Sequence, residues 1–533
     1  MFRFVFSEST PDVYSDELHK CETLFERATS FGHSIFLEQM VRYIFHSFVV
    51  VSMAFVVAVQ PACAQQLAGR RPNIILVMTD DQGMGDLSCM GNEVLRTPHI
   101  DALHAKATRF TDFQVCPTCS PTRAAILGGR HEFRSGVTHT INERERMSLD
   151  TTTFPQLLQQ AGYHTGIFGK WHLGDENAYQ PYNRGFEEVF IHGAGGIGQS
   201  YNCSCADFPP NRKNRYFDIV ALHNDTIVQT EGFCTDVFFR AAKSWIDKQR
   251  QSDQPFFAMI TTNAPHGPFI APDKYRQRYL DFGYDQETAA RYGMIENIDE
   301  NFGAFVSQLA EWKLLENTLL IFMTDNGQGR LAGKLHDRPV ELFNAGFGSG
   351  KNTVHEGGTH VPAFWYWKGV TAEGVDIPAL TAHLDLFPTF CELAGAKIPD
   401  TVQTLEGRSL VPLLENRKAK WDDRMLFTHS GRWKQKSDPN LSKFSNCAVR
   451  TSRWRMVNNR ELYELAADPK ETTNVFSKYP EVVAKLQAAY DVWWQENLPL
   501  MVNENAELSA TQPQVERYEK QLAEQGIPKW EDQ

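Results

Sequence analysis

Two continuous apolar runs, far apart in the chain, each end at an acidic turn. Residues 73–78 (NIILVM) precede the tripeptide TDD, and residues 318–323 (TLLIFM) precede TDNG. An apolar run without polar alternation is typical of a strand buried on both faces of a sheet. The pattern therefore predicts two central strands of similar design, each ending at carboxylate or amide side chains.

Helical and extended patterns alternate between these two runs. Helical periodicity is present over residues 154–162, 236–250 and 301–313, and short apolar segments at 164–169 and 256–262 read as further strands. Strands that alternate with helices favour a mostly parallel sheet covered by helices. We therefore predict an α/β fold with a central, mostly parallel mixed sheet.

The pattern changes near residue 400. Residues 448–465 predict two short antiparallel strands around an Asn-Asn turn, and residues 480–497 predict an amphipathic helix. We therefore expect a catalytic domain over residues 65–404 and a smaller C-terminal α+β subdomain with a polar tail over residues 405–533.

The amino-terminal region has the features of an export signal. Arg42 precedes an apolar stretch at 44–59, and an Ala-Cys-Ala site ends at Ala64. This pattern predicts a signal peptide over residues 40–64, with residues 1–39 as a non-native extension ahead of a start at Met40. A membrane anchor is the alternative, but the apolar stretch is shorter than the roughly 20 residues that a spanning helix needs. We expect a periplasmic or secreted protein.

Composition narrows the function classes. The 533 residues carry a net charge of −12, so a general nucleic-acid binder, which needs a basic face, is disfavoured. Apolar residues make up 42% and charged residues 22%, as in ordinary globular proteins. Export permits disulfides among the cysteines, but the sequence does not reveal their pairing.

The two acidic turns supply candidate metal ligands. Asp80 and Asp81 follow the first strand, and Asp325 and Asn326 follow the second. Ligands in open α/β sheets bind beyond the carboxyl ends of strands, and oxygen donors of this kind suit Ca²⁺ or Mg²⁺. The alternative is that each turn only caps its own strand through Asx hydrogen bonds.

The segment CPTCSPTRAAILGGR, residues 116–130, allows two interpretations. Cys116 and Cys119 have the spacing of a thiol–disulfide pair. However, Ser-Pro at 120–121 predicts a helix start with the serine as N-cap, which puts Cys119 just ahead of an anion-favouring helix terminus. Arg123 lies on the same helix face, where its guanidinium can hold an oxyanion.

This segment resembles the signature of the type I, formylglycine-dependent sulfatases, which are arylsulfatase-like members of the alkaline phosphatase superfamily. In that family the cysteine of Cys-x-Pro-x-Arg is converted to formylglycine (3-oxoalanine). Other segments that resemble the family follow in its order over about residues 70–500: PNIILVMTDDQGMGD, GYHTGIFGKWHLG, NAPHGPF, TLLIFMTDNG, GSGKNTVHEGGTHVP and LYELAADPKETTNV. The resemblance implies an alkaline-phosphatase-like sandwich with a smaller C-terminal domain.

The resemblance also implies a metal and a nucleophile. The family's usual metal is Ca²⁺, with Mg²⁺ as an alternative, and the positions that match its ligands are Asp80, Asp81, Asp325, Asn326 and the formylglycine derived from Cys119. A hydrated aldehyde, unlike a thiol, offers two hydroxyls. One attacks sulfur and displaces the alcohol, and deprotonation of the other releases sulfate and regenerates the aldehyde.

Five side chains match the family's other catalytic positions. By resemblance, Arg123 holds the formylglycine, His172 helps to deprotonate its hydroxyl, and Lys170 contacts the sulfate oxygens. Lys351 also contacts sulfate and serves with His266 as the acid for the leaving alcohol. Asp299 and Arg330, a helix-face residue and a loop charge, are not placed in the site.

We therefore expect a sulfuric ester hydrolase for a sulfated carbohydrate or aryl sulfate, matured by a formylglycine-generating or equivalent enzyme. A phosphonate monoester hydrolase or phosphodiesterase of the same superfamily is the first alternative. A thiol–disulfide module using Cys116 and Cys119, and an unmodified carbohydrate-binding relative, are the others. Loops at 176–235 and 329–347 are expected to select the substrate.

Overall fold

The computed structural model describes residues 66–209 and 215–532, and Gln66–Gln533 is one compact unit. The predicted extension at 1–39 and the signal peptide at 40–64 lie outside the described residues. Within the described ranges, no helix combines the length and apolar character that crossing a bilayer requires. The domain boundary between residues 404 and 405 stays a prediction.

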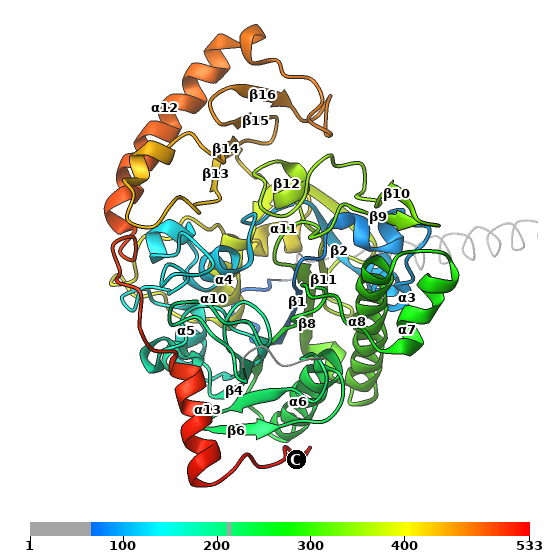
Figure 1. Ribbon diagram of the computed structural model, residues 1–533. Helices are drawn as coiled ribbons and strands as arrows, with labels where there is room; N and C mark the ends of the chain where they lie inside the picture. Colours follow the sequence, from blue (N-terminus) through cyan, green and yellow to red (C-terminus); the bar gives the residue numbers. More distant parts are fainter. Residues whose placement is uncertain (1–65, 210–214, 533) are drawn as a thin grey trace, which may run out of the picture. The chain divides into compact units, whose positions relative to one another are not determined.

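A ten-stranded mixed sheet forms the centre of this unit (Figure 1), with strand order β12-β2-β11-β8-β1-β7-β3-β4-β5-β6. The five neighbours from β8 to β4 run parallel, whereas β11 and β5 run antiparallel to the strands beside them. The prediction of a mostly parallel mixed sheet is therefore confirmed. The strands span β1 Asn73–Thr79, β2 Thr108–Gln114, β3 His164–Lys170, β4 Glu188–His192, β5 Val220–His223, β6 Thr226–Gln229, β7 Phe256–Thr261, β8 Thr318–Thr324, β11 Ala363–Tyr366 and β12 Val375–Ala382.

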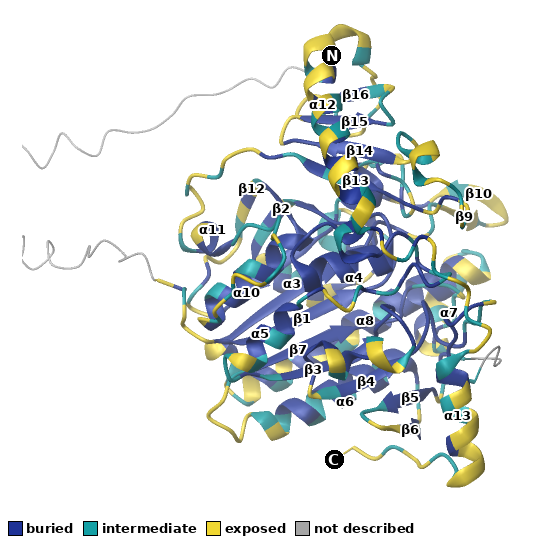
Figure 2. Cartoon of the chain, turned by 90° about the vertical axis from the view of Figure 1, so that its left-hand side faces the viewer, coloured by how far each residue is buried: buried dark blue, intermediate teal, exposed yellow. Residues whose placement is uncertain are grey.

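Helices pack on both faces of the sheet because its central strands are apolar on both sides. Along β1, Ile74 contributes to one core with residues of α4, α5 and α10, and Ile75 contributes to the other with residues of α3, α6 and α8. Figure 1 shows the sheet between these two groups of helices, and Figure 2 shows its central strands buried. This alternation is the period of a β-strand, whose successive side chains point to opposite faces.

The α-helices span α3 Pro98–Lys106, α4 Cys119–Gly128, α5 Phe154–Gln160, α6 Cys234–Gln249, α7 Asp273–Asp281, α8 Gln286–Glu311, α9 Glu356–Thr359, α10 Leu386–Ala394, α11 Val411–Glu415, α12 Pro480–Asn497 and α13 Pro513–Glu524. The helix predicted at 301–313 is the second half of α8. Its first half escaped prediction because it buries polar side chains such as Arg291 and Asn297, which interrupt the apolar stripe.

A separate four-stranded antiparallel sheet packs against α12. Its strands are β13 Leu426–His429, β14 Cys447–Arg450, β15 Trp454–Val457 and β16 Glu461–Glu464, and β9 Ala332–Leu335 pairs with β10 Arg338–Glu341 elsewhere. Trp454, Trp493 and Trp494 are buried in the core between this sheet and α12. These tryptophans are therefore packing residues.

The prediction of two strands over residues 448–465 was wrong in number. Three strands, β14 to β16, occupy this stretch, and the Asn458-Asn459 turn joins the last two. The first of the two predicted strands is split into β14 and β15 because the Thr451 side chain accepts hydrogen bonds from the backbone N–H groups of Arg453 and Trp454. This local turn reverses the chain between β14 and β15.

Candidate active site

The two acidic turns lie side by side at one edge of the sheet. β1 and β8 are parallel neighbours, with Thr79 paired to Thr324, so both turns leave the sheet at the same level. The backbone N–H of Asp81 donates to Asp325 Oδ1 at 3.2 Å, and Asn326 Nδ2 donates to Asp81 Oδ1 at 2.9 Å. The turns are therefore bonded to each other, and the alternative that each only caps its own strand does not account for this arrangement.

Cys119 reaches this edge from the first residue of α4. The helix begins at Cys119 with Thr118 as N-cap, so the predicted start at Pro121 with Ser120 as N-cap was wrong. Ser120 instead lies within the first turn of the helix, and its hydroxyl donates to the backbone oxygen of His172 at 2.8 Å. The ligand atoms of Asp80, Cys119 and Asp325 all lie within 4.8 Å of one another.

Two cations are buried among these groups. Arg123, on the first turns of α4, donates to Asp325 Oδ2 at 3.0 Å and to the backbone oxygen of Lys170 at 2.8 Å. Lys170 ends β3, and its Nζ lies 2.5 Å from Asp80 Oδ2. The side chains of Arg123, Lys170, Asp80 and Asp325 are at most 1% exposed. Each of these two aspartates therefore has its own cationic partner.

Lys351 supplies a third cation from the loop that follows β10. Its Nζ lies 2.6 Å from Asp81 Oδ1, and its side chain is 13% exposed. Burial opposes ionisation of both groups, but their opposite charges outweigh it. The pKa of Asp81 is therefore held well below its usual value and that of Lys351 above it. Asp81 adopts a left-handed φ of 63°, which turns its side chain back toward the site.

Two histidines complete the set. The Nε2–H of His172 donates to the backbone oxygen of Thr140 at 2.8 Å, which leaves Nδ1 facing Cys119 Sγ at 3.4 Å. The Nδ1–H of His266 donates to the Gly267 oxygen, and its Nε2 lies 3.9 Å from Asp81 Oδ2. Burial and then the nearby lysine charges lower the pKa of both rings. Each histidine is thus a neutral base at neutral pH.

The oxygen atoms of the site fit a hard cation. Asp80 Oδ1 and Asn326 Oδ1 are buried and have no hydrogen-bond partner among the described residues. Burial and the adjacent Asp80 charge also raise the pKa of Asp325 to about 7, although Arg123 and Lys170 oppose this shift. A divalent cation would bind the unpartnered oxygens and stabilise all three carboxylates as anions. Protein oxygen ligands of this kind favour Ca²⁺ or Mg²⁺ over zinc.

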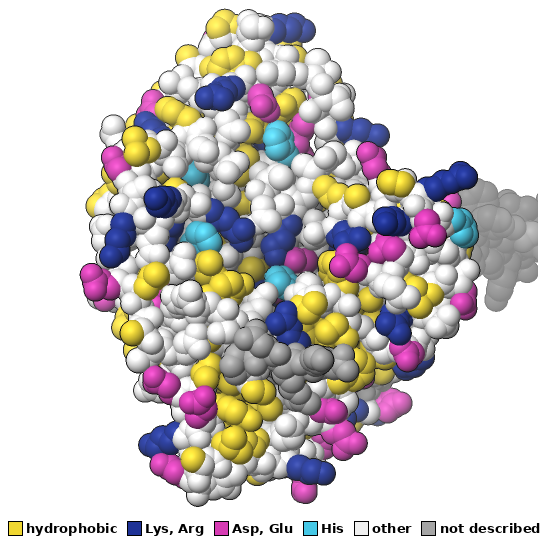
Figure 3. Space-filling view, in the orientation of Figure 1, with side chains coloured by type: hydrophobic (Ala, Val, Ile, Leu, Met, Phe, Trp, Pro, Cys, Tyr) yellow, Lys and Arg dark blue, Asp and Glu magenta, His cyan; other side chains and the backbone are white. Residues whose placement is uncertain are grey.

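All ten predicted site residues are brought together at this edge, and the two excluded residues lie outside the set. The Asp299 carboxylate accepts from the backbone N–H groups of His99 and Ile100 and so caps α3. Arg330 forms ion pairs with acidic residues near the start of α8. In Figure 3, basic and histidine side chains gather in the middle of one face. Lys351 and His266 are the predicted catalytic residues with the most exposed side chains, at 13% and 18%.

Sequence reasoning missed Arg291. This residue of α8 is fully buried, forms an ion pair with Asp86, and donates from Nη2 to the backbone oxygen of Asp81 at 3.1 Å. It therefore holds the first acidic turn in place through the backbone of Asp81 and the side chain of Asp86. Asp86, in the turn after β1, indicated that a cationic partner was needed, but nothing in the sequence identified Arg291 as that partner.

The two cysteines of the CPTC segment face different neighbours. Cys116 Sγ lies 3.2 Å from His383 Nε2, whereas Cys119 Sγ faces His172. Every cysteine in the described part of the chain is free. Burial raises the pKa of the Cys116 thiol well above its usual value, with Glu132 adding to the shift. A reactive thiolate, which a thiol–disulfide module needs, is therefore disfavoured at Cys116.

Comparison with known proteins places most of the chain in one family. The family model described as Sulfatase matches residues 72–396, and the model described as N-sulphoglucosamine sulphohydrolase, C-terminal, matches residues 348–492. N-acetylgalactosamine-6-sulfatase of Canis lupus familiaris is 31% identical over 381 residues, which cover 68% of this chain and 69% of the relative. Arylsulfatase A of Homo sapiens is 33% identical over 369 residues, covering 65% and 68%.

Solved structures show the same fold. Ps i-CgsB, solved in complex with k-i-k-neocarrahexaose, is 27% identical with a TM-score of 0.70, and the match covers 82% of this chain and 95% of that one. The PsFucS1 sulfatase from Pseudoalteromonas sp. is 20% identical with a TM-score of 0.64, covering 84% and 93%, and this likeness concerns the fold alone.

Proposed function

Because the chain belongs to the sulfatase family and is a sulfuric ester hydrolase, we propose that Cys119, converted to formylglycine, is its nucleophile in a calcium site. The family uses a metal ion together with formylglycine. The observation that carries the proposal is the position of Cys119 Sγ, within 4.8 Å of carboxylate oxygens of Asp80 and Asp325 and 3.4 Å from a neutral His172.

The proposed metal ligands are Asp80, Asp81, Asp325, Asn326 and residue 119. Ca²⁺ held there would supply positive charge that acidifies a bound hydroxyl and offsets the charge of the sulfate group. The two unpartnered oxygens, Asp80 Oδ1 and Asn326 Oδ1, support this ligand set. We prefer Ca²⁺ to Mg²⁺ because a site built from several protein oxygens suits an ion that accepts six to eight ligands.

The nucleophile needs a defined orientation and a base. Conversion of Cys119 supplies an aldehyde, whose hydrate offers one hydroxyl to attack sulfur and another whose deprotonation releases sulfate. His172 Nδ1 faces this position with a free lone pair, so it accepts the second proton. Arg123 packs between Asp325 and the Lys170 backbone and keeps the start of α4 next to the acidic turns.

Three cationic or histidine side chains act on the substrate. Lys170 and Lys351 bring positive charge to the sulfate oxygens, where charge is stabilised in the transition state. Lys351 and His266 are the partly exposed members of the set, so they lie where the alcohol portion must leave. Lys351 is protonated and donates the proton to the leaving oxygen. The neutral His266 offers its Nε2 lone pair, which accepts a hydrogen bond from the departing alcohol.

We infer that the substrate is a sulfated saccharide and that it is hydrolysed outside the cytoplasm. The names of the relatives support the first part, since one is an N-acetylgalactosamine-6-sulfatase and Ps i-CgsB was solved with a neocarrahexaose. The predicted signal peptide supports the second. A formylglycine-generating or equivalent enzyme must then act on Cys119. A screen of sulfated oligosaccharides for sulfate release identifies the substrate.

Two measurements on protein matured in its own host test the proposal. Mass spectrometry of the peptide around Cys119 should show the mass decrease of a thiol-to-aldehyde conversion, and an aryl sulfate should turn over faster than an aryl phosphodiester. An intact thiol in active enzyme contradicts the formylglycine assignment. A strong preference for the phosphodiester instead favours the phosphodiesterase alternative.

A further inference from the structure

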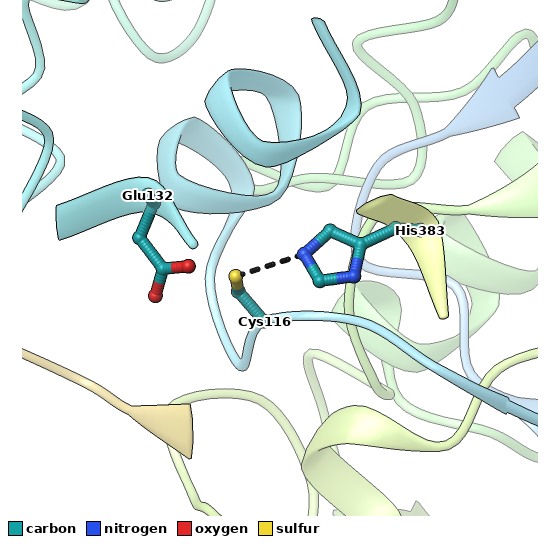
Figure 4. Close-up of side chains that lie close together, drawn as sticks. All are labelled: Cys116, Glu132 and His383. Atoms are coloured by element: carbon teal, nitrogen blue, oxygen red, sulfur yellow. Dashed lines mark hydrogen bonds between the residues drawn. The ribbon is translucent and has the colours of Figure 1, made fainter. Parts of the chain in front are cut away.

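A second cluster of potential metal ligands lies outside the active site. Cys116 follows β2, Glu132 begins the short helix η3 (Glu132–Ser135), and His383 begins η7 (His383–Asp385) after β12. One ligand atom from each lies within 4.8 Å of the others, and all three residues are buried. Figure 4 shows the three side chains, from separate segments, pointing toward one another.

The histidine is oriented as a metal ligand would be. His383 Nδ1–H donates to the backbone oxygen of Gln114 at 3.1 Å, so its Nε2 lone pair faces the Cys116 sulfur at 3.2 Å. A backbone carbonyl on the far ring nitrogen is the usual partner of a metal-bound histidine, because it selects the tautomer and fixes the ring. A tetrahedral ion with bonds of about 2.3 Å to sulfur and 2.0 Å to nitrogen separates those atoms by about 3.5 Å. The observed separation is close to this value.

The carboxylate of Glu132 is buried without a cation beside it. Glu132 is 1% exposed, and neither of its side-chain oxygens accepts a hydrogen bond from the described residues. His131 Nδ1 lies 3.4 Å from Oε2, but this nitrogen accepts from the backbone N–H of Phe133 and so has no proton to offer. Burial raises the pKa of Glu132 to about 8, although the neighbouring Cys116 thiol opposes this shift. An isolated buried carboxylate is costly, and a cation beside it removes that cost.

We propose that Cys116, Glu132 and His383 bind a zinc ion through Sγ, a carboxylate oxygen and Nε2. Zinc is the metal that one thiolate, one imidazole and one carboxylate suit best, whereas the active site offers hard oxygen ligands. Binding releases the thiol proton, and the carboxyl proton where Glu132 carries one. Because the site is buried, zinc enters while the chain folds.

The site would hold both ends of the helix that carries Cys119. Cys116 lies three residues before Cys119, at the start of α4, and Glu132 lies just beyond its end at Gly128, while His383 belongs to a distant segment. Ligation would also keep the Cys116 sulfur from forming a disulfide with Cys119 before maturation. This role rests on the proposed function of Cys119, whereas zinc binding itself does not.

Metal analysis of the whole chain, produced in zinc-supplemented medium and passed over a chelating resin, tests the proposal. We expect about one zinc ion per chain in the wild type and close to none in Cys116→Ala. Cys391→Ala, which removes another buried free cysteine, should keep its zinc. Asp325→Asn and Cys119→Ala should also keep it, which separates this site from the active site and from the proposed function.

Cobalt provides a second measurement. Protein produced with Co²⁺ should show a thiolate-to-cobalt charge-transfer band in the near ultraviolet, absent from Cys116→Ala and present in Cys391→Ala. Glu132→Gln keeps the shape of the side chain, so it serves if Cys116→Ala does not fold, and it should retain zinc at least about tenfold less strongly. The proposal is overturned if the wild type holds no zinc, or if Cys116→Ala and Glu132→Gln hold as much zinc as the wild type.

Discussion

Lys170 and Asp80 form an ion pair with no exposure to solvent, with Nζ 2.5 Å from Oδ2. Lys170 ends β3 and Asp80 follows β1, and β7 lies between these two strands in the sheet. Burial disfavours the charged form of Lys170, but the charge of Asp80 outweighs it and raises the pKa of the lysine. The active site therefore contains a permanent cation, and replacing Lys170 would leave the buried Asp80 carboxylate without its partner.

We predict that Lys170→Met destabilises the protein and slows hydrolysis. The change leaves the Asp80 carboxylate buried without its cation, and breaking such pairs costs about 3–5 kcal/mol. Turnover of an aryl sulfate should fall at least about 100-fold, because a charge that stabilises the transition state is lost. Urea unfolding in the presence of a chelator and steady-state kinetics measure the two effects.

Lys368→Met is the matched control for this variant. Lys368 pairs with Glu316 at 2.8 Å on the surface, where both side chains are about half exposed. Solvent already screens such a pair, so its loss should change neither stability nor turnover measurably. Equal stability of the Lys170 and Lys368 variants would show that the buried pair contributes nothing.

We predict that calcium stabilises the folded protein through Asp325. Chelation of the wild type should lower its melting temperature and abolish activity, and added Ca²⁺ should restore both. At 100 times its dissociation constant, a ligand specific to the native state contributes about 2.7 kcal/mol. Asp325→Asn should show a much smaller calcium-dependent shift in a thermal melt, because one charged ligand is lost.

Asp299→Asn separates this effect from general destabilisation. Asp299 caps α3 through backbone N–H groups and is not among the proposed ligands. Its variant should melt at a lower temperature yet keep the full calcium-dependent shift. If the Asp299 and Asp325 variants respond to calcium alike, Asp325 is not a ligand.

We predict opposite outcomes for the two cysteines of the CPTC segment. Cys119→Ala should abolish sulfate release, because no aldehyde can form at that position. Cys116→Ser should retain turnover per converted molecule, because its sulfur faces His383 rather than the acidic turns. Sulfate release normalised to the formylglycine content measures this difference. Loss of turnover in fully converted Cys116→Ser protein would place Cys116 in the reaction.

We predict that Glu145 makes the protein less stable as the pH rises from 4.5 to about 8. Burial raises the pKa of this glutamate from 4.5 to about 8, and neither of its side-chain oxygens has a hydrogen-bond partner among the described residues. Between pH 4.5 and 8 the native state keeps a proton that the unfolded chain releases. The free energy of unfolding therefore falls as the pH rises through this range, by up to about 1.4 kcal/mol per pH unit.

Glu145→Gln should remove this share of the pH dependence. Its stability relative to the wild type should increase from about pH 5 to about pH 8, which is close to the range between the unfolded and folded pKa values of Glu145. Urea unfolding at each pH measures this difference. Glu507→Gln, which changes a side chain that is 93% exposed, should run parallel to the wild type. A Glu145→Gln profile that also runs parallel to the wild type contradicts the prediction.

The sequence alone indicated which residues the fold brings together at the acidic turns better than it indicated their surroundings. β1 and β8 were identifiable because their apolar runs have no polar alternation, and the structure buries all seven residues of each strand. Their acidic turns mark the strand ends directly. The start of α4 was misplaced by two residues, because Ser120 is a good N-cap by type, whereas in the fold Thr118 takes that position and Ser120 lies inside the helix.

What the sequence determined by itself is the local chemistry: apolar strands, acidic turns, and a cysteine ahead of an arginine on one helix. Only the tertiary structure decided which of these side chains meet. Lys170 with Asp80, Arg291 with the first turn, and Cys116 with His383 are separated by 90, 210 and 267 residues along the chain. No local pattern encodes such pairings, because they depend on strand order and helix packing, which form only when the whole core is buried.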